Sequence, residues 1–224
     1  MMLIKKITIE HIIITTGVIA LLPFLILSFY NHPSGDDYSC TNIANQYGFW
    51  GAQKYWYNNW KCSLAYTMLV SKNPLIIKWF WGYKIIPFIF LLTSVFLFYF
   101  LIGTITSGAL TLKQKWAIVF AFFISYLYYV PNVWEAFYWF TSITSYQVST
   151  MFMIIFMIAL FKYKNEIMNK KKSLLYLSVL AILIMQGSET YMVFMTVFIL
   201  MFMLLELIFY NRIDRWHILL LIVI

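Results

Sequence analysis

Three long stretches without any charged side chain are the feature that most limits the fold of this chain. No Asp, Glu, Lys or Arg occurs in residues 11–35, 85–112 or 136–161. A membrane-spanning helix needs about 20 predominantly apolar residues, and each stretch is long enough. Only 11% of all residues are charged, against about 25% in soluble domains. The sequence therefore predicts an all-α, polytopic transmembrane helix bundle.

We expect residues 1–224 to form a single transmembrane domain with six to seven spans. The predicted spans are about 11–30, 85–103, 115–130, 148–161, 174–187, 191–209 and 216–224, and residues 31–84 form the first outer loop. The last apolar run is still open at Ile224, so we expect the protein to continue beyond it. A cleaved signal peptide is the alternative at the N-terminus, but its apolar region would be only about 7–15 residues long. We therefore favour an uncleaved first helix.

Residues 173–209 are predicted to form a helical hairpin. A single helix of this length would measure about 55 Å, well beyond a hydrocarbon core of about 30 Å, and both of its ends are basic. The turn then falls at residues 186–189. Because a carboxylate within the membrane is costly unless it faces water, a partner or a cavity, we expect Glu189 to face one of these.

The distribution of basic residues predicts the orientation in the membrane. Cytoplasmic segments carry an excess of Lys and Arg. With a cytoplasmic N-terminus, eleven of the sixteen basic residues lie in short inner segments: Lys5, Lys6, Lys113, Lys115, Lys162, Lys164, Lys170, Lys171, Lys172, Arg212 and Arg215. Asp36, Asp37, Glu135 and Glu189 then lie on the outer side. The net charge of +8 thus reflects membrane orientation, and we expect the lipid bilayer as a partner and no nucleic acid.

The acidic pair Asp36 and Asp37 follows the first predicted span and has several possible roles. Asp is a preferred helix N-cap, so the pair could simply begin a helix. A carboxylate could also act as a general base, and two could hold a divalent cation such as Mg²⁺ or Mn²⁺. Because successive helical residues diverge by about 100°, we expect the two to differ in role. Our hypothesis is that Asp36 caps the helix and Asp37 reacts.

The first outer loop is rich in aromatic residues, which favour the membrane interface. We expect short amphipathic helices lying on the bilayer surface, either as a packed cap over the bundle or as a platform where a lipid-linked substrate docks. Cys40 and Cys62 both fall in this loop. A disulfide is permitted outside the cytoplasm, but unpaired packing cysteines are an equal alternative. His32 beside the aspartates is interpreted as a solvated loop residue.

The order of short acidic motifs resembles that of GT-C glycosyltransferases, and in particular of bacterial GT-C-like membrane proteins related to O-antigen glucosyltransferases. The matching segments are Gly35-Asp36-Asp37-Tyr38, then Glu135-Ala136-Phe137-Tyr138-Trp139 with Tyr146, and Gly187-Ser188-Glu189-Thr190. One departure concerns a Trp-Asn-Gly-Arg-like element in the first outer loop. Asn58-Asn59-Trp60-Lys61 occupies its place, and Lys61 lacks the bidentate fork that Arg offers a phosphate.

The resemblance implies transfer of a sugar from a polyprenyl-phosphate-linked donor to an extracytoplasmic glycan or lipid acceptor, in the bacterial inner membrane. In such an enzyme Asp36 or Asp37 would be the base or a metal ligand, and Lys61 would meet the donor phosphate. Glu135, Tyr138, Tyr146 and Glu189 would bind substrate. Two other classes stay open, namely a transporter or flippase of a lipid-linked or polar substrate, and a non-catalytic multi-pass membrane protein. The absence of an internal repeat and the gathering of acids on one face count against transport.

Overall fold

The computed structural model describes residues 8–60, 63–164 and 170–211. Every regular element in these ranges is a helix, which confirms the all-α prediction. The elements are α1 (Ile9–Ser28), α2 (Asp36–Asn59), α3 (Leu64–Val70), the 3₁₀ helix η1 (Pro74–Ile77), α4 (Gly82–Ile105), α5 (Leu112–Tyr129), α6 (Val133–Phe137), α7 (Phe140–Ser142), the π-helix η2 (Ile143–Gln147), α8 (Val148–Lys164), α9 (Lys170–Met185) and α10 (Glu189–Tyr210). The predicted seventh span, 216–224, lies outside the described residues.

Four helices are long and apolar enough to cross a membrane. They are Ile9–Ser28, Gly82–Ile105, Phe140–Lys164 and Glu189–Phe209. The other two predicted spans within the described residues are also helical, as α5 and α9, and α9 is a shorter apolar helix. These helices indicate a membrane protein, whereas the total of six to seven spans stays a prediction.

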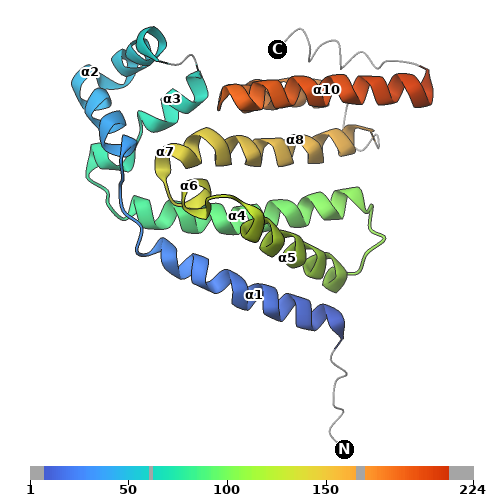
Figure 1. Ribbon diagram of the computed structural model, residues 1–224. Helices are drawn as coiled ribbons and strands as arrows, with labels where there is room; N and C mark the ends of the chain where they lie inside the picture. Colours follow the sequence, from blue (N-terminus) through green and yellow to red (C-terminus); the bar gives the residue numbers. More distant parts are fainter. Residues whose placement is uncertain (1–7, 61–62, 165–169, 212–224) are drawn as a thin grey trace, which may run out of the picture.

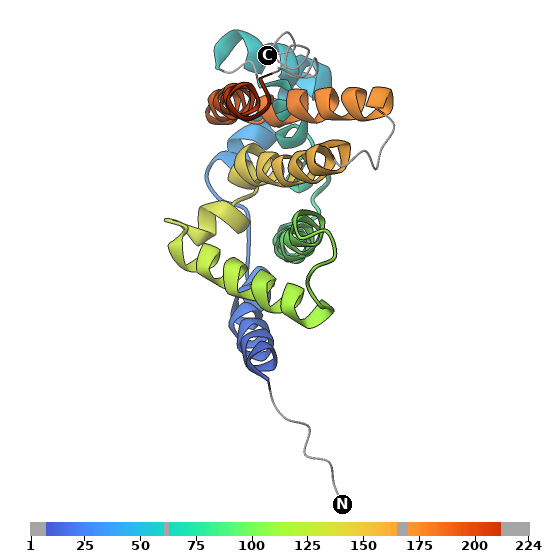
Figure 2. The ribbon, with the colours of Figure 1, turned by 90° about the vertical axis from the view of Figure 1, so that its right-hand side faces the viewer.

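The long helices lie beside one another and share two ends. Figure 1 shows α1, α4, α8 and α10 stacked with roughly parallel axes, and Figure 2 shows the same stack turned by 90°. We call the end that carries α2, α3, α6 and α7 the loop end. The segments that were predicted to be outer lie at this end, whereas the side of the membrane that it faces stays a prediction. Gly17 allows a close approach of α1 to α5, because a Cβ at this position would lie 2.5 Å from the Cβ of Phe120.

The loop end differs from the prediction in one segment and agrees with it in another. Residues 36–59 consist of two helices that meet at a kink at Gly48, whose positive φ of 67° is available to glycine at little cost, so separate short helices are present as expected. The span predicted at 148–161 begins at Phe140 instead, so the polar residues 141–149 belong to a membrane-length helix. Their hydroxyls are satisfied within the fold, as when Thr144 donates to the carbonyl of Thr141 at 2.8 Å.

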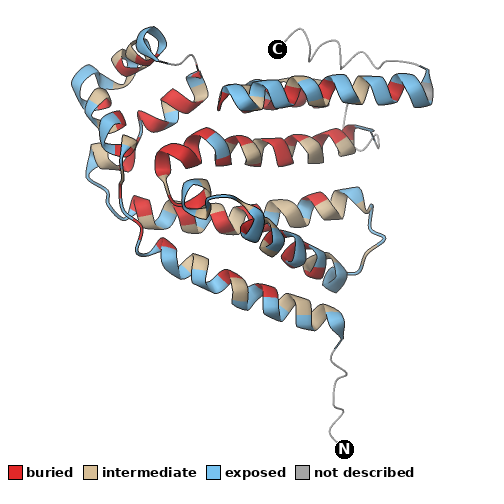
Figure 3. Cartoon of the chain, viewed as in Figure 1, coloured by how far each residue is buried: buried red, intermediate tan, exposed pale blue. Residues whose placement is uncertain are grey.

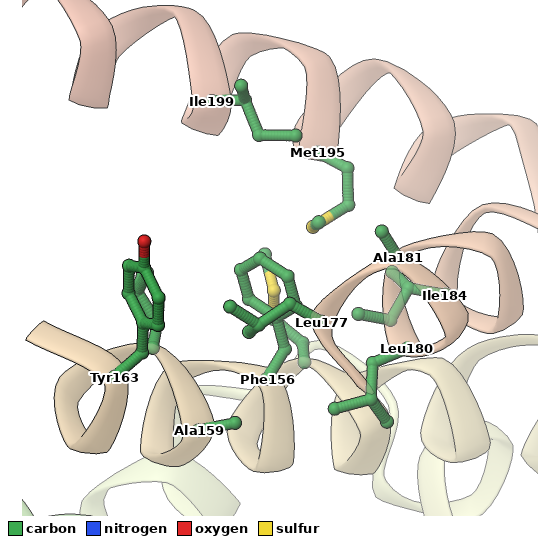
Figure 4. Packing of buried hydrophobic residues seen from close by; sticks show 11 residues of the cluster. Phe156, Ala159, Tyr163, Leu177, Leu180, Ala181, Ile184, Met195 and Ile199 are labelled. Carbon is green, nitrogen blue, oxygen red and sulfur yellow. The ribbon is translucent and has the colours of Figure 1, made fainter. Parts of the chain in front are cut away.

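The helix α8 lies at the centre of the bundle. Of the most apolar 18 residues of Phe140–Lys164, 56% are buried, whereas the corresponding share is 17% for α1 and for α10. Figure 3 shows this contrast as a largely buried α8 between more exposed outer helices. Phe156 of α8 packs with Leu177 of α9 and Met195 of α10, all three fully buried (Figure 4). The apolar surface left exposed on α1 and α10 is suited to contact with lipid.

A charged pair within the bundle was not recognised from the sequence. Glu206 interrupts the apolar run of α10, and its side chain is 8% exposed while it forms an ion pair with Lys164 of α8. Lys164 also lies over the ring of Phe202 at 5.4 Å. Because an unpaired charge in an apolar environment is costly, this pair should hold α10 against α8.

We expect Glu206→Gln to lower the stability of the detergent-solubilised protein by about 3 kcal/mol, the lower part of the range for breaking a buried ion pair. Lys164 reaches solvent in part, so the upper part of that range is not expected. Thermal unfolding followed by intrinsic fluorescence measures the change. Glu189→Gln, at an exposed carboxylate of the same helix, is the matched control and should be nearly neutral. Equal losses in both variants would contradict the pairing.

Candidate functional site

The Asp37 carboxylate is the most highly hydrogen-bonded acid at the loop end. Its Oδ1 accepts from the backbone N–H of Thr141 at 3.0 Å and from the Thr141 hydroxyl at 2.6 Å. Its Oδ2 accepts from the backbone N–H of Ser34 at 3.1 Å. Asp37 is only 1% exposed, and burial raises the pKa of its carboxyl, although the bonds from Thr141 and Ser34 oppose that shift. These contacts make Asp37 an anchor between α2 and α7.

A network of buried asparagines extends this anchor. Asn73 donates to the backbone carbonyl of Asp37 at 3.1 Å and accepts a short hydrogen bond from the Tyr83 hydroxyl. Asn31 donates to the carbonyls of Tyr83 and Tyr138 at 2.8 and 2.7 Å. The segment between α1 and α2 is therefore tied to α4 and α6. Sequence reasoning missed both asparagines. The Asn-Pro pair at 73–74 is a helix-start signal that could have drawn attention to Asn73.

Asp36 has a different environment from its neighbour. It is half-buried, and the N-cap of α2 is Gly35, with no side-chain cap bond. The hypothesis that Asp36 caps the helix is therefore wrong, and the carboxylate engaged at the helix start is that of Asp37. The expected divergence of the pair is confirmed. The physical reason for the different environments is Thr141, whose N–H and hydroxyl donate to Asp37 on the buried side of this first turn. The prediction that Asp37 reacts stays untested.

Asp36 belongs to a cluster with Cys40, Tyr66 and Tyr146, which we call the carboxylate–tyrosine cluster. Burial, and next the charge of Asp36, raise the pKa of the Cys40 thiol to about 12. Burial, followed by the nearby Cys40 and Asp36, also raises the pKa of the Tyr66 hydroxyl. Tyr146 acts on Tyr66 in the same direction. Cys40 follows Asp36 by one helical turn and shares a buried apolar cluster with Tyr66. Tyr146 belongs to η2, which contacts the helix α3 that carries Tyr66, and of the two tyrosines it is Tyr146 that is exposed.

An apolar cavity of about 310 Å³ adjoins this cluster through Tyr66. Its other walls come from α3, η2, α8, α9 and the turn before α10: Ala65, Met68, Leu69, Thr144, Val148, Ser149, Phe152, Leu183 and Gly187. Gly187 is required at this turn, because a Cβ would lie 1.7 Å from Oγ of Ser149. Gln186 fastens α3 to the same turn by accepting the N–H of Leu64 at 2.8 Å on its side chain.

The remaining predicted site residues divide between exposed and structural positions. Glu135 is exposed and accepts from the amide of Asn132 at 2.8 Å. Tyr138 is buried and donates to the carbonyl of Phe24 at 2.7 Å, and burial raises the pKa of its hydroxyl to about 12. Glu189 is exposed in the first turn of α10. Of the predicted substrate residues, only Tyr146 joins Asp36 in the carboxylate–tyrosine cluster.

Two residues singled out from the sequence, Lys61 and Cys62, lie outside the described residues. The disulfide between Cys40 and Cys62 therefore stays untested. Cys40 itself is a buried, free thiol.

The acidic pair does not fit the predicted divalent metal site. Asp37 presents its two oxygens to N–H and O–H donors, so Asp36 is the single carboxylate of the pair that a cation could approach. In residues 8–60, 63–164 and 170–211, no three His, Cys, Asp or Glu side chains gather closely enough to hold a metal ion.

We expect Thr141→Val to lower the stability of the solubilised protein by about 1.5–3 kcal/mol, the worth of a hydrogen bond to a charged group. Asp37→Ala should cost at least as much, and the double variant should cost less than the sum, because both changes break the same contact. Asp36→Ala is the matched control, and its effect should stay within about 0.5 kcal/mol. Thermal unfolding measures all four. Additive losses for Asp37 and Thr141 would contradict the anchor.

Comparisons of the chain with protein-family models, with curated proteins and with solved structures gave no match. Its function must therefore be inferred from the geometry of the loop end. That geometry consists of an anchored aspartate, a half-buried aspartate beside two tyrosines, and an adjoining apolar cavity.

Proposed function

We propose that this protein is a membrane glycosyltransferase that moves a sugar from a polyprenyl-phosphate-linked donor to an extracytoplasmic glycan or lipid acceptor. Asp36 is the general base of the reaction. The observation that carries the proposal is the difference between the two aspartates: Asp37 is buried and hydrogen-bonded, whereas Asp36 is half-buried. Asp37 and Thr141 fix the first turn of α2, and this leaves Asp36 half-buried at a defined position, near enough to Tyr66 to raise the pKa of its hydroxyl.

The main catalytic requirement of this glycosyl transfer is a correctly positioned base. Asp36 takes the proton from an acceptor hydroxyl, whose oxygen attacks the anomeric carbon of the donor sugar. A new glycosidic bond forms as the bond from the anomeric carbon to the phosphate oxygen breaks, and polyprenyl phosphate leaves with the bonding electrons. Positioned general bases contribute about 10²–10⁴-fold to rates. In this proposal the exposed Tyr146 binds substrate.

The surroundings of the cluster suit a lipid-linked donor. The first isoprene units occupy the apolar cavity next to Tyr66, while the rest of the chain stays in the bilayer. Lys61 attracts the donor phosphate as a point charge. The exposed carboxylates Glu135 and Glu189 bind sugar hydroxyls at the loop end, and Tyr138 holds the wall between α1 and α6. A resident metal is not part of this proposal, since Asp37 is occupied by its donors.

The loop end faces the extracytoplasmic side in this account, and the N-terminus is cytoplasmic. Lys113, Lys115, Lys162, Lys164 and Lys172 support this orientation, because they lie in the helix ends opposite the loop end (Figure 1). A polyprenyl-linked donor and an envelope glycan meet on that side of a bacterial inner membrane.

A transporter or flippase is the second candidate. Two observations favour it, namely the buried ion pair of Lys164 with Glu206 and the π-helical segment Ile143–Gln147 at the start of α8. Ionisable residues and interrupted helices inside the membrane are frequent in transporters. The two candidates differ in chemistry, because a flippase moves the lipid-linked sugar without transferring it.

We expect Asp36→Asn to reduce sugar transfer at least 100-fold with no loss of stability, because the proton acceptor is removed and the fold is not. The measurement compares the envelope glycan by mass spectrometry in cells that lack the protein and in cells that regain the wild type or a variant. Asp37→Asn is the informative partner. It should lose activity and stability together.

Two outcomes would overturn the proposal. One is an unchanged glycan when the protein is removed. The other is wild-type transfer by Asp36→Asn, which would leave no role for the base. For the flippase candidate, the purified wild type and the Asp36→Asn variant would move polyprenyl-phosphate-linked hexose across a vesicle bilayer equally well.

A further inference from the structure

A second cavity lies at the loop end, between the end of α1 and α6. Its volume is about 380 Å³, which is within the range of about 300–1,000 Å³ typical of small-molecule sites. Phe24, Leu27, Tyr30, Asn31, His32, Val133, Trp134 and Tyr138 line it. None of them belongs to the carboxylate–tyrosine cluster or to the apolar cavity beside Tyr66, so this is a separate site.

The floor of this cavity is rigid, and its polar groups are already paired. Asn31 uses its amide N–H groups on the carbonyls of Tyr83 and Tyr138. The hydroxyl of Tyr138 reaches back to the carbonyl of Phe24 at 2.7 Å. The cavity is therefore preformed, and a ligand that enters it does not have to order its floor.

One wall is a fixed aromatic platform. Trp134 stacks on Trp139 with ring centroids 5.3 Å apart and an interplanar angle of 14°. Trp134 is 42% exposed and Tyr30 is 74% exposed, so both present ring surface to an incoming molecule. A flat, immobilised ring surface of this kind matches the C–H face of a pyranose, whose hydroxyls then project sideways toward hydrogen-bonding groups.

Polar groups flank the platform. The imidazole of His32 is held through Nδ1 by the carbonyl of Tyr30 at 3.1 Å, which leaves Nε2 for a ligand hydroxyl. Glu135 is exposed and follows Trp134 in α6. Its Oε1 accepts a hydrogen bond from the side-chain amide of Asn132, and its Oε2 can accept a hydrogen bond from a ligand.

We propose that this cavity is a carbohydrate-binding subsite, in which Trp134 stacks on a pyranose ring and His32 binds one of its hydroxyls. In the transferase, the subsite holds the acceptor sugar, a role that rests on the proposed function. Binding of a sugar ring does not rest on it. His32 then has a ligand-binding role, in contrast to its interpretation as a solvated loop residue.

Saturation-transfer difference NMR tests the binding directly. The probes are the methyl pyranosides of glucose, galactose and N-acetylglucosamine, and the protein is kept in a detergent without a sugar head group. We expect transfer to pyranose C–H protons for at least one probe in the wild type. Trp134→Ala should weaken binding about tenfold, since a stacked aromatic contact is worth up to about 1.5 kcal/mol. Trp134→Phe should retain most of the binding, and His32→Ala should weaken it.

Trp50→Ala is the matched control, because Trp50 is 74% exposed on α2 and is not part of the cavity. Three results would overturn the subsite: no signal from any of the pyranosides, equal signals in wild type and Trp134→Ala, or Trp134-dependent signals from palmitate in place of sugars.

Kinetics then tests the acceptor role. Trp134→Ala should raise the acceptor concentration for half-maximal transfer about tenfold and leave that for the donor unchanged. Trp134-dependent sugar binding without any transfer would confirm the subsite and overturn only the transferase.

Discussion

The hydrogen bonds between Asp37 and Thr141 are the contact on which the rest of the loop end depends. They join residues 104 positions apart in the sequence, at the first turn of α2 and the first turn of the central membrane helix. Because the Asp37 carboxylate is buried, its loss would leave unpaired donors as well as a gap between the two helices. Asn73 and Asn31 spread the same constraint to α4 and α6. The loop end is thus a fixed structure over the ends of the long helices.

This anchoring determines where chemistry can occur. Asp37 is 1% exposed and accepts three hydrogen bonds within the fold, so a substrate has little access to its carboxylate, whereas its half-buried neighbour can be reached. Asp36 therefore gains a precise position from bonds that it does not make itself. The apolar cavity beside Tyr66 and the aromatic cavity beside Trp134 are two separate spaces at the loop end. In the proposed transferase, the first would take the lipid chain of the donor and the second the sugar ring of the acceptor.

Much of this fold could be predicted from the apolar runs, because a membrane span requires length and the absence of charge, and both can be read from sequence. The start of the central helix at Phe140 could not be predicted. The Thr, Ser and Gln residues that follow Phe140 are typical of a loop. Only contacts such as the hydrogen bond from the Ser145 hydroxyl to the carbonyl of Gly187 show how these polar groups are satisfied. The importance of residues 36–37 was predicted for similar reasons of charge. Which aspartate is buried depends on Thr141, and no local pattern signals a partner so distant. Glu206 was overlooked because its pairing with Lys164 joins two different helices.

The central claim is that Asp37 ties the start of α2 to the start of the central membrane helix and so sets the position of Asp36. Hydrogen–deuterium exchange of the protein in lipid nanodiscs tests it most directly, read at peptides that cover residues 139–147. Slow exchange is predicted for the wild type and for Asp36→Ala, and markedly faster exchange for Asp37→Ala, because the N–H of Thr141 then loses its acceptor. Slow exchange in Asp37→Ala as well would contradict the account.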